Sequence, residues 1–302
     1  MPGPLLVADV PWLLYRSYFA LPASITGADG EPVNALLGTV NALLALLEAR
    51  LAARGGVRAV VACLGAEQAT YRVQLYAGYH AQREPKPAPL ASQWAKAPEL
   101  LGAFGWTVAE GGELEADDVM FSYAHAERRA GGEALLLTGD RDLFAAAGEG
   151  VSVVQPRRGG GHEEIDAAGV RERYGVAPAQ VSDLIALRGD PSDGLPGAAG
   201  IGAKTAASLL RRHGSLERVL EVAGAGGDER MSARAAATLS DNAQLLRTFK
   251  RVATLQLIDV RRPRDRATDL AGGARAARAL GMRRLAERLT KLAEDDACGW
   301  HG

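Results

Sequence analysis

Four short apolar runs, separated by helical patterns, constrain this chain to an α/β fold. The runs are PLLVADV, VRAVVACLG, EALLLTGD and VSVVQP. Runs of this kind are typical of strands that are buried on both faces of a parallel sheet. Helical patterns at 33–54, 92–104 and 116–130 lie between them. The first half of the chain therefore predicts a doubly wound, mainly parallel sheet.

The second half of the chain has a different pattern. After about residue 165 the sequence becomes helical, and glycine-rich turns such as those at Gly189 and Gly214 punctuate it. We therefore expect an α/β domain over 1–165 and an all-α domain over 166–302. The stretch QPRRGGGHEEI is the expected junction.

Composition narrows the class of protein. The 302 residues are 47% hydrophobic with a net charge of -1, so no global basic signature indicates nucleic acid, although a local basic surface is compatible with that balance. The isolated cysteines Cys63 and Cys298 form neither a disulfide framework nor a zinc pattern, which predicts a cytoplasmic protein. The N-terminus lacks the features of a signal peptide, and we expect no apolar run long enough to span a membrane.

Carboxylates follow the predicted strands and open one of the predicted helices. In an open parallel sheet, ligands bind at the carboxyl ends of the strands, so these side chains are expected at one edge. They come from five segments of the chain, including the stretch GGELEADDVM. The residues are Asp9, Glu115, Asp117, Asp118, Asp140, Asp142, Asp190 and Asp193.

Such a cluster would be costly through like-charge repulsion unless cations offset it. Mg²⁺ and Mn²⁺ prefer carboxylate and water oxygens, and two such ions can promote hydrolysis of a phosphodiester. Each piece also has a plain structural interpretation: a helix N-terminus for ELEADD, a turn for GDRD and an Asx-turn for GDPSDG. Their joint occurrence favours a site for two or more Mg²⁺ or Mn²⁺ ions.

A glycine turn follows the last carboxylates, in LPGAAGIGAKTAASLLRRHG. Gly200 and Gly202 form a tight turn, and Lys204 and Thr205 open the next helix. Free amides at a helix N-terminus bind phosphate without reading bases. The alternatives are a helix-turn-helix used only for packing and a nucleotide-binding loop, but the spacing of the latter is absent. We expect a helix-hairpin-helix-like motif over about 180–215.

These motifs resemble those of the 5'-nuclease family. That family includes the 5'→3' exonuclease domain of bacterial DNA polymerase I, phage 5'-nucleases, flap endonucleases and stand-alone actinobacterial exonucleases. The matching stretches run in the family order over most of 5–221, and include LLVADVPWLLYRSYFALP, TYRVQLYAGYHAQREPKP, ELEADDVM, TGDRDLF and RGDPSDGLPGAAGIGAKTA. The resemblance implies a PIN-like core with a helical arch over about 70–90, followed by a helix-3-turn-helix domain.

The resemblance also implies an activity, which is cleavage of DNA near a 5' end or at the base of a 5' flap, in replication or repair. It assigns Asp9, Glu115, Asp117 and Asp118 to one metal group and Asp140, Asp142, Asp190 and Asp193 to the second. It adds His80 and Arg83 to the catalytic residues and a K⁺ ion near the turn at 200–202. The DNA contacts that it implies are Tyr15, Arg16, Arg72, Tyr79, Gly200, Gly202, Lys204 and Thr205.

Three positions depart from the family pattern. Gly65 stands where the family has a metal-binding Asp, with Glu67 two residues later as a substitute. His80 stands where the arch has a Lys, and DVPW follows Asp9 where small and polar residues are expected. These departures leave open a catalytically weakened protein that binds branched DNA. A PIN-type ribonuclease is a third hypothesis, and the GIGAKT hairpin argues against it.

The expected partner is DNA with 5' ends, flaps or gaps. No polymerase domain follows, so we expect a monomer that works with a DNA polymerase in trans and has no membrane contact. The Arg-rich stretch ARAARALGMRRLAERLTK is expected to be a helix, and a solvated face is favoured over a DNA contact.

Overall fold

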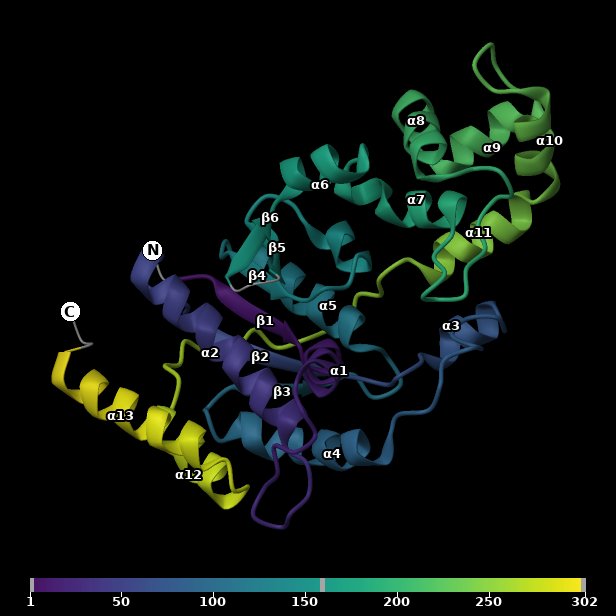
Figure 1. Ribbon diagram of the computed structural model, residues 1–302. Helices are drawn as coiled ribbons and strands as arrows, with labels where there is room; N and C mark the ends of the chain where they lie inside the picture. Colours follow the sequence, from purple (N-terminus) through teal and green to yellow (C-terminus); the bar gives the residue numbers. More distant parts are fainter. Residues whose placement is uncertain (1–2, 158–160, 300–302) are drawn as a thin grey trace.

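A six-stranded sheet forms the centre of the computed structural model, which describes residues 3–157 and 161–299. The order is β3-β2-β1-β4-β5-β6, and only β6 runs antiparallel to its neighbour. The α/β fold with a mainly parallel sheet, followed by a helical part, is confirmed (Figure 1). The strands are β1 (Leu5–Asp9), β2 (Ala59–Leu64), β3 (Thr107–Glu110), β4 (Ala134–Leu137), β5 (Val151–Pro156) and β6 (His162–Ile165).

Helices cover both faces of the sheet, which explains why its central strands are apolar throughout. Leu5 and Val7 of β1 belong to one buried cluster, while Leu6 and Ala8 belong to the other. Successive side chains of a strand point to opposite faces, so a strand that is covered on both sides carries no polar alternation. The short apolar runs of the sequence are the direct result.

The helices fall into two groups. One face of the sheet carries α5 (Ala116–Arg129), and the other carries α1 (Val10–Ala20), α2 (Asn34–Arg54) and α4 (Ala88–Gly102). The short helix α3 (Thr70–Leu75) packs against the helical part (Figure 1). That part contains α6 (Ala167–Tyr174), α7 (Val181–Arg188), α8 (Ala203–His213), α9 (Leu216–Gly224), α10 (Ala233–Asp241) and α11 (Ala243–Val252).

Some elements differ from the expected ones. The stretch QPRRGGGHEEI contains the end of β5 and all of β6, which pair antiparallel in the sheet, and its residues 158–160 lie outside the described ranges. The strand β3 was not expected, because its four residues are too few to give a pattern. The helix α4 begins four residues earlier than the pattern at 92–104 indicates, and a Pro lies in its first turn, where no backbone donor is needed.

The expectation about membrane-spanning length needs a correction. Residues Asn34–Ala52 of α2 are long and apolar enough to cross a membrane, by length and composition alone. The helix packs against α1 and α4, and its Leu36, Val40 and Leu43 belong to the core beneath the sheet. Burial inside the fold therefore accounts for its apolarity.

The last two helices return to the α/β part, which differs from the expected division at residue 166. The chain crosses back after α11, where the N–H of Arg266 donates to the carbonyl of Arg58 at 2.8 Å. The helices α12 (Leu270–Ala279) and α13 (Arg283–Gly299) then lie beside α2 and α4 (Figure 1). Their apolar side chains, including Leu285 and Leu289, complete the core on that face.

The strand order creates a crevice at one edge of the sheet. From β1 the chain builds β2 and β3 on one side, then returns to build β4 on the other. The carboxyl ends of β1 and β4 therefore flank a topological switch point, where α/β sheets bind ligands. Asp9 ends β1, and Asp140 follows β4.

The packing of α13 gives a first prediction. Leu289 is fully buried against the α/β core, so Leu289→Ala should lower the free energy of unfolding by about 2–5 kcal/mol. Urea denaturation measures this change. The matched control is Arg283→Ala on the exposed side of the same helix, which should stay within about 0.5 kcal/mol of the parent. Equal effects of the two substitutions would show that α13 does not complete the core.

Candidate active site

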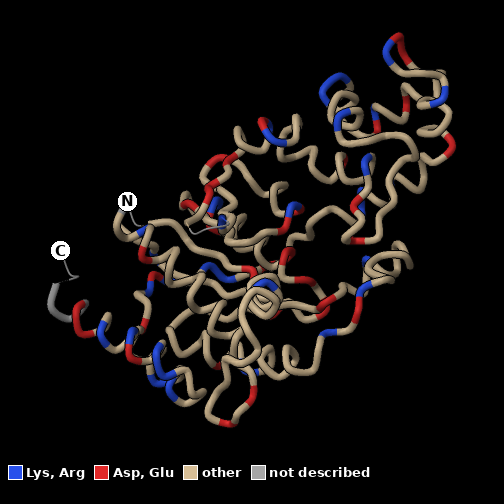
Figure 2. Tube along the Cα trace, viewed as in Figure 1, with Lys and Arg blue, Asp and Glu red and all other residues tan. Residues whose placement is uncertain are grey.

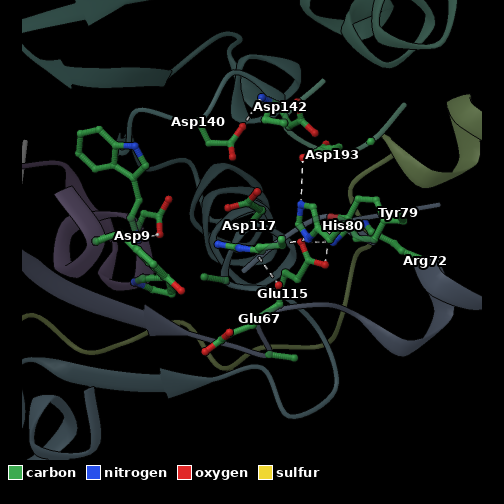
Figure 3. Close-up of a pocket in the computed structure, with 18 of the residues that line it drawn as sticks. Asp9, Glu67, Arg72, Tyr79, His80, Glu115, Asp117, Asp140, Asp142 and Asp193 are labelled. Atoms are coloured by element: carbon green, nitrogen blue, oxygen red, sulfur yellow. Dashed lines mark hydrogen bonds and ion pairs between the residues drawn. The ribbon is translucent and has the colours of Figure 1, made fainter. Parts of the chain in front are cut away.

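A pocket of about 440 Å³ opens at the switch point of the sheet (Figure 3). The end of β1, the start of α5, the turn after β4, the 191–194 loop and the segment 79–83 contribute to its walls. Most of the predicted carboxylates meet here, although they come from distant parts of the chain. Those that line the pocket are Asp9, Glu115, Asp117, Asp140, Asp142 and Asp193.

Asp9 is fixed by the two strands at the centre of the sheet. It is 3% exposed and accepts hydrogen bonds from the N–H of Trp12 at 2.9 Å and from the Thr138 hydroxyl at 2.6 Å. The same hydroxyl accepts from the N–H of Asp140 at 2.9 Å. Thr138 thus joins the ends of β1 and β4. Sequence reasoning missed it, although a hydroxyl residue at the end of an apolar run was a usable signal.

The carboxylates disfavour one another's charge. Burial raises the pKa of Asp9 to about 6, although its hydrogen bonds with Thr138 and Trp12 oppose the shift. Burial and the charges of neighbouring carboxylates hold the pKa values of Asp117 and Asp142 well above their ordinary range, and burial also raises the pKa of Asp140. The charges of Arg83 and Arg72 oppose the shifts of Asp9 and Asp142 but do not cancel them, so a bound cation would favour the charged carboxylates.

Glu115 is oriented by the base of the segment 70–89. It accepts from the N–H of Ala69 at 2.7 Å and from the Tyr79 hydroxyl at 2.9 Å, and it pairs with Arg72 at 2.9 Å. Tyr79 is 3% exposed, and its hydroxyl is committed to Glu115. In this placement Tyr79 orients Glu115, and its contact with DNA stays a prediction.

Arg72 and Asp118 form a buried pair at 2.8 Å, in which Arg72 contributes to the pocket wall and Asp118 does not. The Arg72 guanidinium also donates to the carbonyl of Val252 at 3.0 Å, while Asp118 accepts from the N–H of Gln256 at 2.7 Å. Arg72 is 3% exposed and Asp118 is fully buried. Both side chains tie α3 and the segment 252–256 to α5, and the assignments of Arg72 to DNA and of Asp118 to a metal ion stay predictions.

The two carboxylates of GDPSDG differ in orientation. Asp190 is 7% exposed and accepts from the N–H of Ser192 at 3.0 Å within its own turn, so it lies behind the pocket instead of lining it. Asp193 lines the pocket and contacts Nε2 of His80 at 3.1 Å. The N–H of His80 also donates to the Asp193 carbonyl at 3.1 Å. His80 has a φ of 51°, a left-handed conformation that no other non-glycine residue adopts among those described, and these contacts hold it there.

Gly65 is in close contact with the start of α5. A Cβ atom at this position would lie 2.5 Å from the N atom of Ala116 and 2.5 Å from the carbonyl oxygen of Leu114. The backbone that carries Glu115 therefore fills the space that a side chain would need. Glu67 does line the pocket, and its carboxylate pairs with Lys86.

The remaining predicted residues lie in or next to the pocket and at the start of α8. Tyr15 and Arg83 line the pocket, and the guanidinium of Arg83 lies 5.5 Å from the Tyr15 ring. Arg16 is exposed on the neighbouring turn of α1. The exposed residues Gly200, Gly202, Lys204 and Thr205 lie at the start of α8, outside the carboxylate pocket.

The donor set fits a hydrated divalent cation better than a preformed cage. No three Asp, Glu, His or Cys side chains converge on a single metal position within the described ranges. Mg²⁺ keeps several of its waters and is commonly held by one or two carboxylates together with substrate phosphates. Uncompensated carboxylates that raise one another's pKa values are the environment that such an ion stabilises.

Comparison with known proteins identifies the family to which the fold and the motifs belong. The family model described as 5'-3' exonuclease, N-terminal resolvase-like domain, matches residues 4–175, and the model for its C-terminal SAM fold matches 176–265. The chain belongs to the 5'-3' exonuclease family. The resemblance seen in the sequence is therefore confirmed.

Individual relatives agree with the family models. A 5'-3' exonuclease of Mycobacterium tuberculosis is 37% identical over 74% of this chain and 74% of its own length. A thermostable DNA polymerase I of Thermus thermophilus is 37% identical over 95% of this chain, which spans only 32% of that polymerase. The flap endonuclease of bacteriophage T5, in a pseudo-enzyme–product complex with DNA and metal ions, has a TM-score of 0.65 at 17% identity, covering 96% of this chain and 99% of that chain. At this identity, the structural match shows a shared fold.

The contact at Gly65 gives a second prediction. Gly65→Asp should not create a working metal ligand, because its Cβ would overlap the backbone at 114–116. We expect a lower free energy of unfolding and no gain in divalent-ion binding, measured by urea denaturation and calorimetry. Gly224→Asp, at a glycine with open space around it, is the control and should leave both unchanged. Tighter Mg²⁺ binding by Gly65→Asp would contradict this account of the loop.

The raised pKa values give a third prediction. The pKa of Asp9 rises from 3.8 to about 6 on folding, so the folded chain binds more protons than the unfolded chain between these values. Stability from this group is therefore greatest below about pH 4 and is lost as the pH rises through about 6. A divalent ion offsets that loss, so Mg²⁺ should raise the unfolding temperature more at about pH 8 than at about pH 5. An Mg²⁺ effect that does not change with pH would contradict binding at these carboxylates.

Proposed function

We propose that this chain is a metal-dependent 5'→3' exonuclease and 5'-flap endonuclease that hydrolyses DNA phosphodiesters. The observation that carries the proposal is the convergence of Asp9, Glu115, Asp117, Asp140 and Asp142 in one pocket at the switch point of the sheet. Family membership and the names of the matched relatives support the reaction and the DNA substrate.

The acidic residues of the pocket would hold two or more Mg²⁺ or Mn²⁺ ions. Such ions, when bound, supply an activated water and neutralise charge on the phosphate. Asp9 and Asp140 are positioned through Thr138, and Glu115 is positioned through Tyr79. Arg83, exposed at the mouth of the pocket, is placed to neutralise the phosphate that enters.

The helical part would bind the duplex. We propose that the turn at Gly200–Gly202 contacts the DNA backbone, because added Cβ atoms at both glycines would meet open space and the amides of α8 are free to face phosphate. Lys204 and Thr205 lie beside this turn, and a K⁺ ion near it is part of the proposal. We propose that a nuclease core over about 1–165, completed by α12 and α13, carries cleavage and that the helices between them carry DNA binding.

The weakened DNA-binding protein is not favoured. It rested on Gly65 as a lost ligand, whereas the position is occupied by the backbone that presents Glu115. The carboxylates that line the pocket would have no purpose in a protein that only binds.

The same relatives support a cellular role for this chain. They include DNA polymerase I proteins, which supports a role in replication or repair beside a DNA polymerase acting in trans. We propose a cytoplasmic monomer that acts on 5' ends, flaps or gaps.

Cleavage of a 5'-labelled flap duplex with Mg²⁺ and with Mn²⁺ tests the function. Asp117→Asn should lower the rate by ~100-fold or more, since loss of even an outer-shell partner of a metal costs about 10- to 100-fold. Asp241→Asn removes an exposed carboxylate of α10 and should cut like the parent. The proposal would be overturned if the parent cut the flap with neither Mg²⁺ nor Mn²⁺, or if Asp117→Asn kept full activity.

A further inference from the structure

We propose that one face of α1 is a stacking track for the unpaired bases of the DNA strand that enters the pocket. Trp12, Tyr15 and Phe19 form the track. The inference rests on the proposed nuclease function and adds to it the part of the site that holds bases rather than phosphates.

The three rings share one side of the helix. Their spacing of three and four residues puts them on the same face of α1. The rings of Tyr15 and Phe19 are stacked, with 6.5 Å between centroids and 19° between planes. Trp94 of α4 meets Tyr15 edge-on at 5.9 Å. Trp12, Tyr15 and Trp94 all line the pocket, so the track begins beside the carboxylates and leads outward to Phe19.

Trp12 lies at the inner end of the track. Its backbone N–H donates to the Asp9 carboxylate. Its indole lies so close to Gly139 that a Cβ added there would come within 2.1 Å of the ring. Only glycine after Thr138 leaves room for an indole between the ends of β1 and β4. The ring thus lies against the two strand ends that carry Asp9 and Asp140, next to the position of the reacting phosphate.

Phe19 lies at the outer end, where packing does not explain it. Its side chain is 72% exposed, more than Leu245 at 39% and Leu257 at 53%, the other exposed large apolar side chains of the described residues. An exposed ring in stacking contact with Tyr15 offers a free face to a base.

Three rings of the pocket wall have a cation beside them. Arg16 lies 5.7 Å from the Trp12 ring, Arg83 5.5 Å from Tyr15 and Lys86 3.3 Å from Trp94. Arg16 and Arg83 form no ion pair with a carboxylate of the described residues. Rings for bases, alternating with cations for phosphates, are the elements by which proteins bind single strands without reading their sequence.

The test compares two flaps on one duplex, with Ca²⁺ in place of Mg²⁺ so that binding is measured without cutting. One flap carries thymidines and the other carries abasic residues, which keep the phosphates and lack the bases. Fluorescence anisotropy gives the affinity for each. The variants are Phe19→Ala and Trp12→Leu, and Leu257→Ala is the control at a comparably exposed site.

For each base that stacks, the parent and the control should bind the thymidine flap about 5- to 150-fold more tightly than the abasic flap. Phe19→Ala and Trp12→Leu should lose most of that preference and keep the salt dependence of binding. Since Phe19 is exposed, its variant remains informative even if Trp12→Leu folds poorly.

Equal binding of both flaps by the parent, or an undiminished preference in Phe19→Ala, would overturn the track. Cleavage is measured separately with Mg²⁺. A protein that cuts flaps without a base preference lacks the track but keeps the proposed function. A protein with the preference that never cuts keeps the track and loses the nuclease function.

Discussion

Repulsion among buried carboxylates is the constraint on which the rest of the structure depends. Burial is the largest cause of the raised pKa values of Asp9, Asp117, Asp140 and Asp142, and neighbouring carboxylates add to each of these shifts. A flexible site would relax by moving them apart. Here they are fixed at the ends of central strands and at the first turn of α5, where the core on both faces of the sheet leaves them no room to separate.

Arg72, a cation in the wall of the pocket, is held by buried partners. Arg72 pairs with Asp118 and with Glu115, and its third contact is the backbone at Val252. Breaking a buried pair of this kind leaves an uncompensated charge, which is strongly destabilising. The pair therefore fixes α3 and the segment 252–256 relative to α5, and the pocket carboxylates other than Glu115 are left for a ligand.

Glycines decide two of the features that distinguish this site. Gly65 allows the backbone at 114–116 to approach β2, and Gly139 allows the Trp12 indole to lie across the ends of β1 and β4. In both places the missing side chain is a requirement of close packing. The missing side chain at Gly65 and the position of the Trp12 indole are thus both consequences of close packing around the site.

The sequence by itself determined the fold class and the edge where the site lies. Strands that are buried on both faces must be apolar, and the carboxyl ends of parallel strands must share an edge, so Asp9 and Asp140 were predictable neighbours. The Arg-rich stretch 274–291 was likewise predicted to be a helix, but it forms parts of two helices, α12 and α13, and only the tertiary structure placed them on the α/β core.

Tertiary structure also decided which carboxylates face the pocket. Asp117 and Asp118 are adjacent in the sequence, yet consecutive residues of a helix point about 100° apart, so one lines the pocket while the other pairs with Arg72. The acidic pattern contains both residues equally. The choice between them depends on which neighbour lies on each side of α5, and those neighbours come from parts of the chain that the local sequence does not specify.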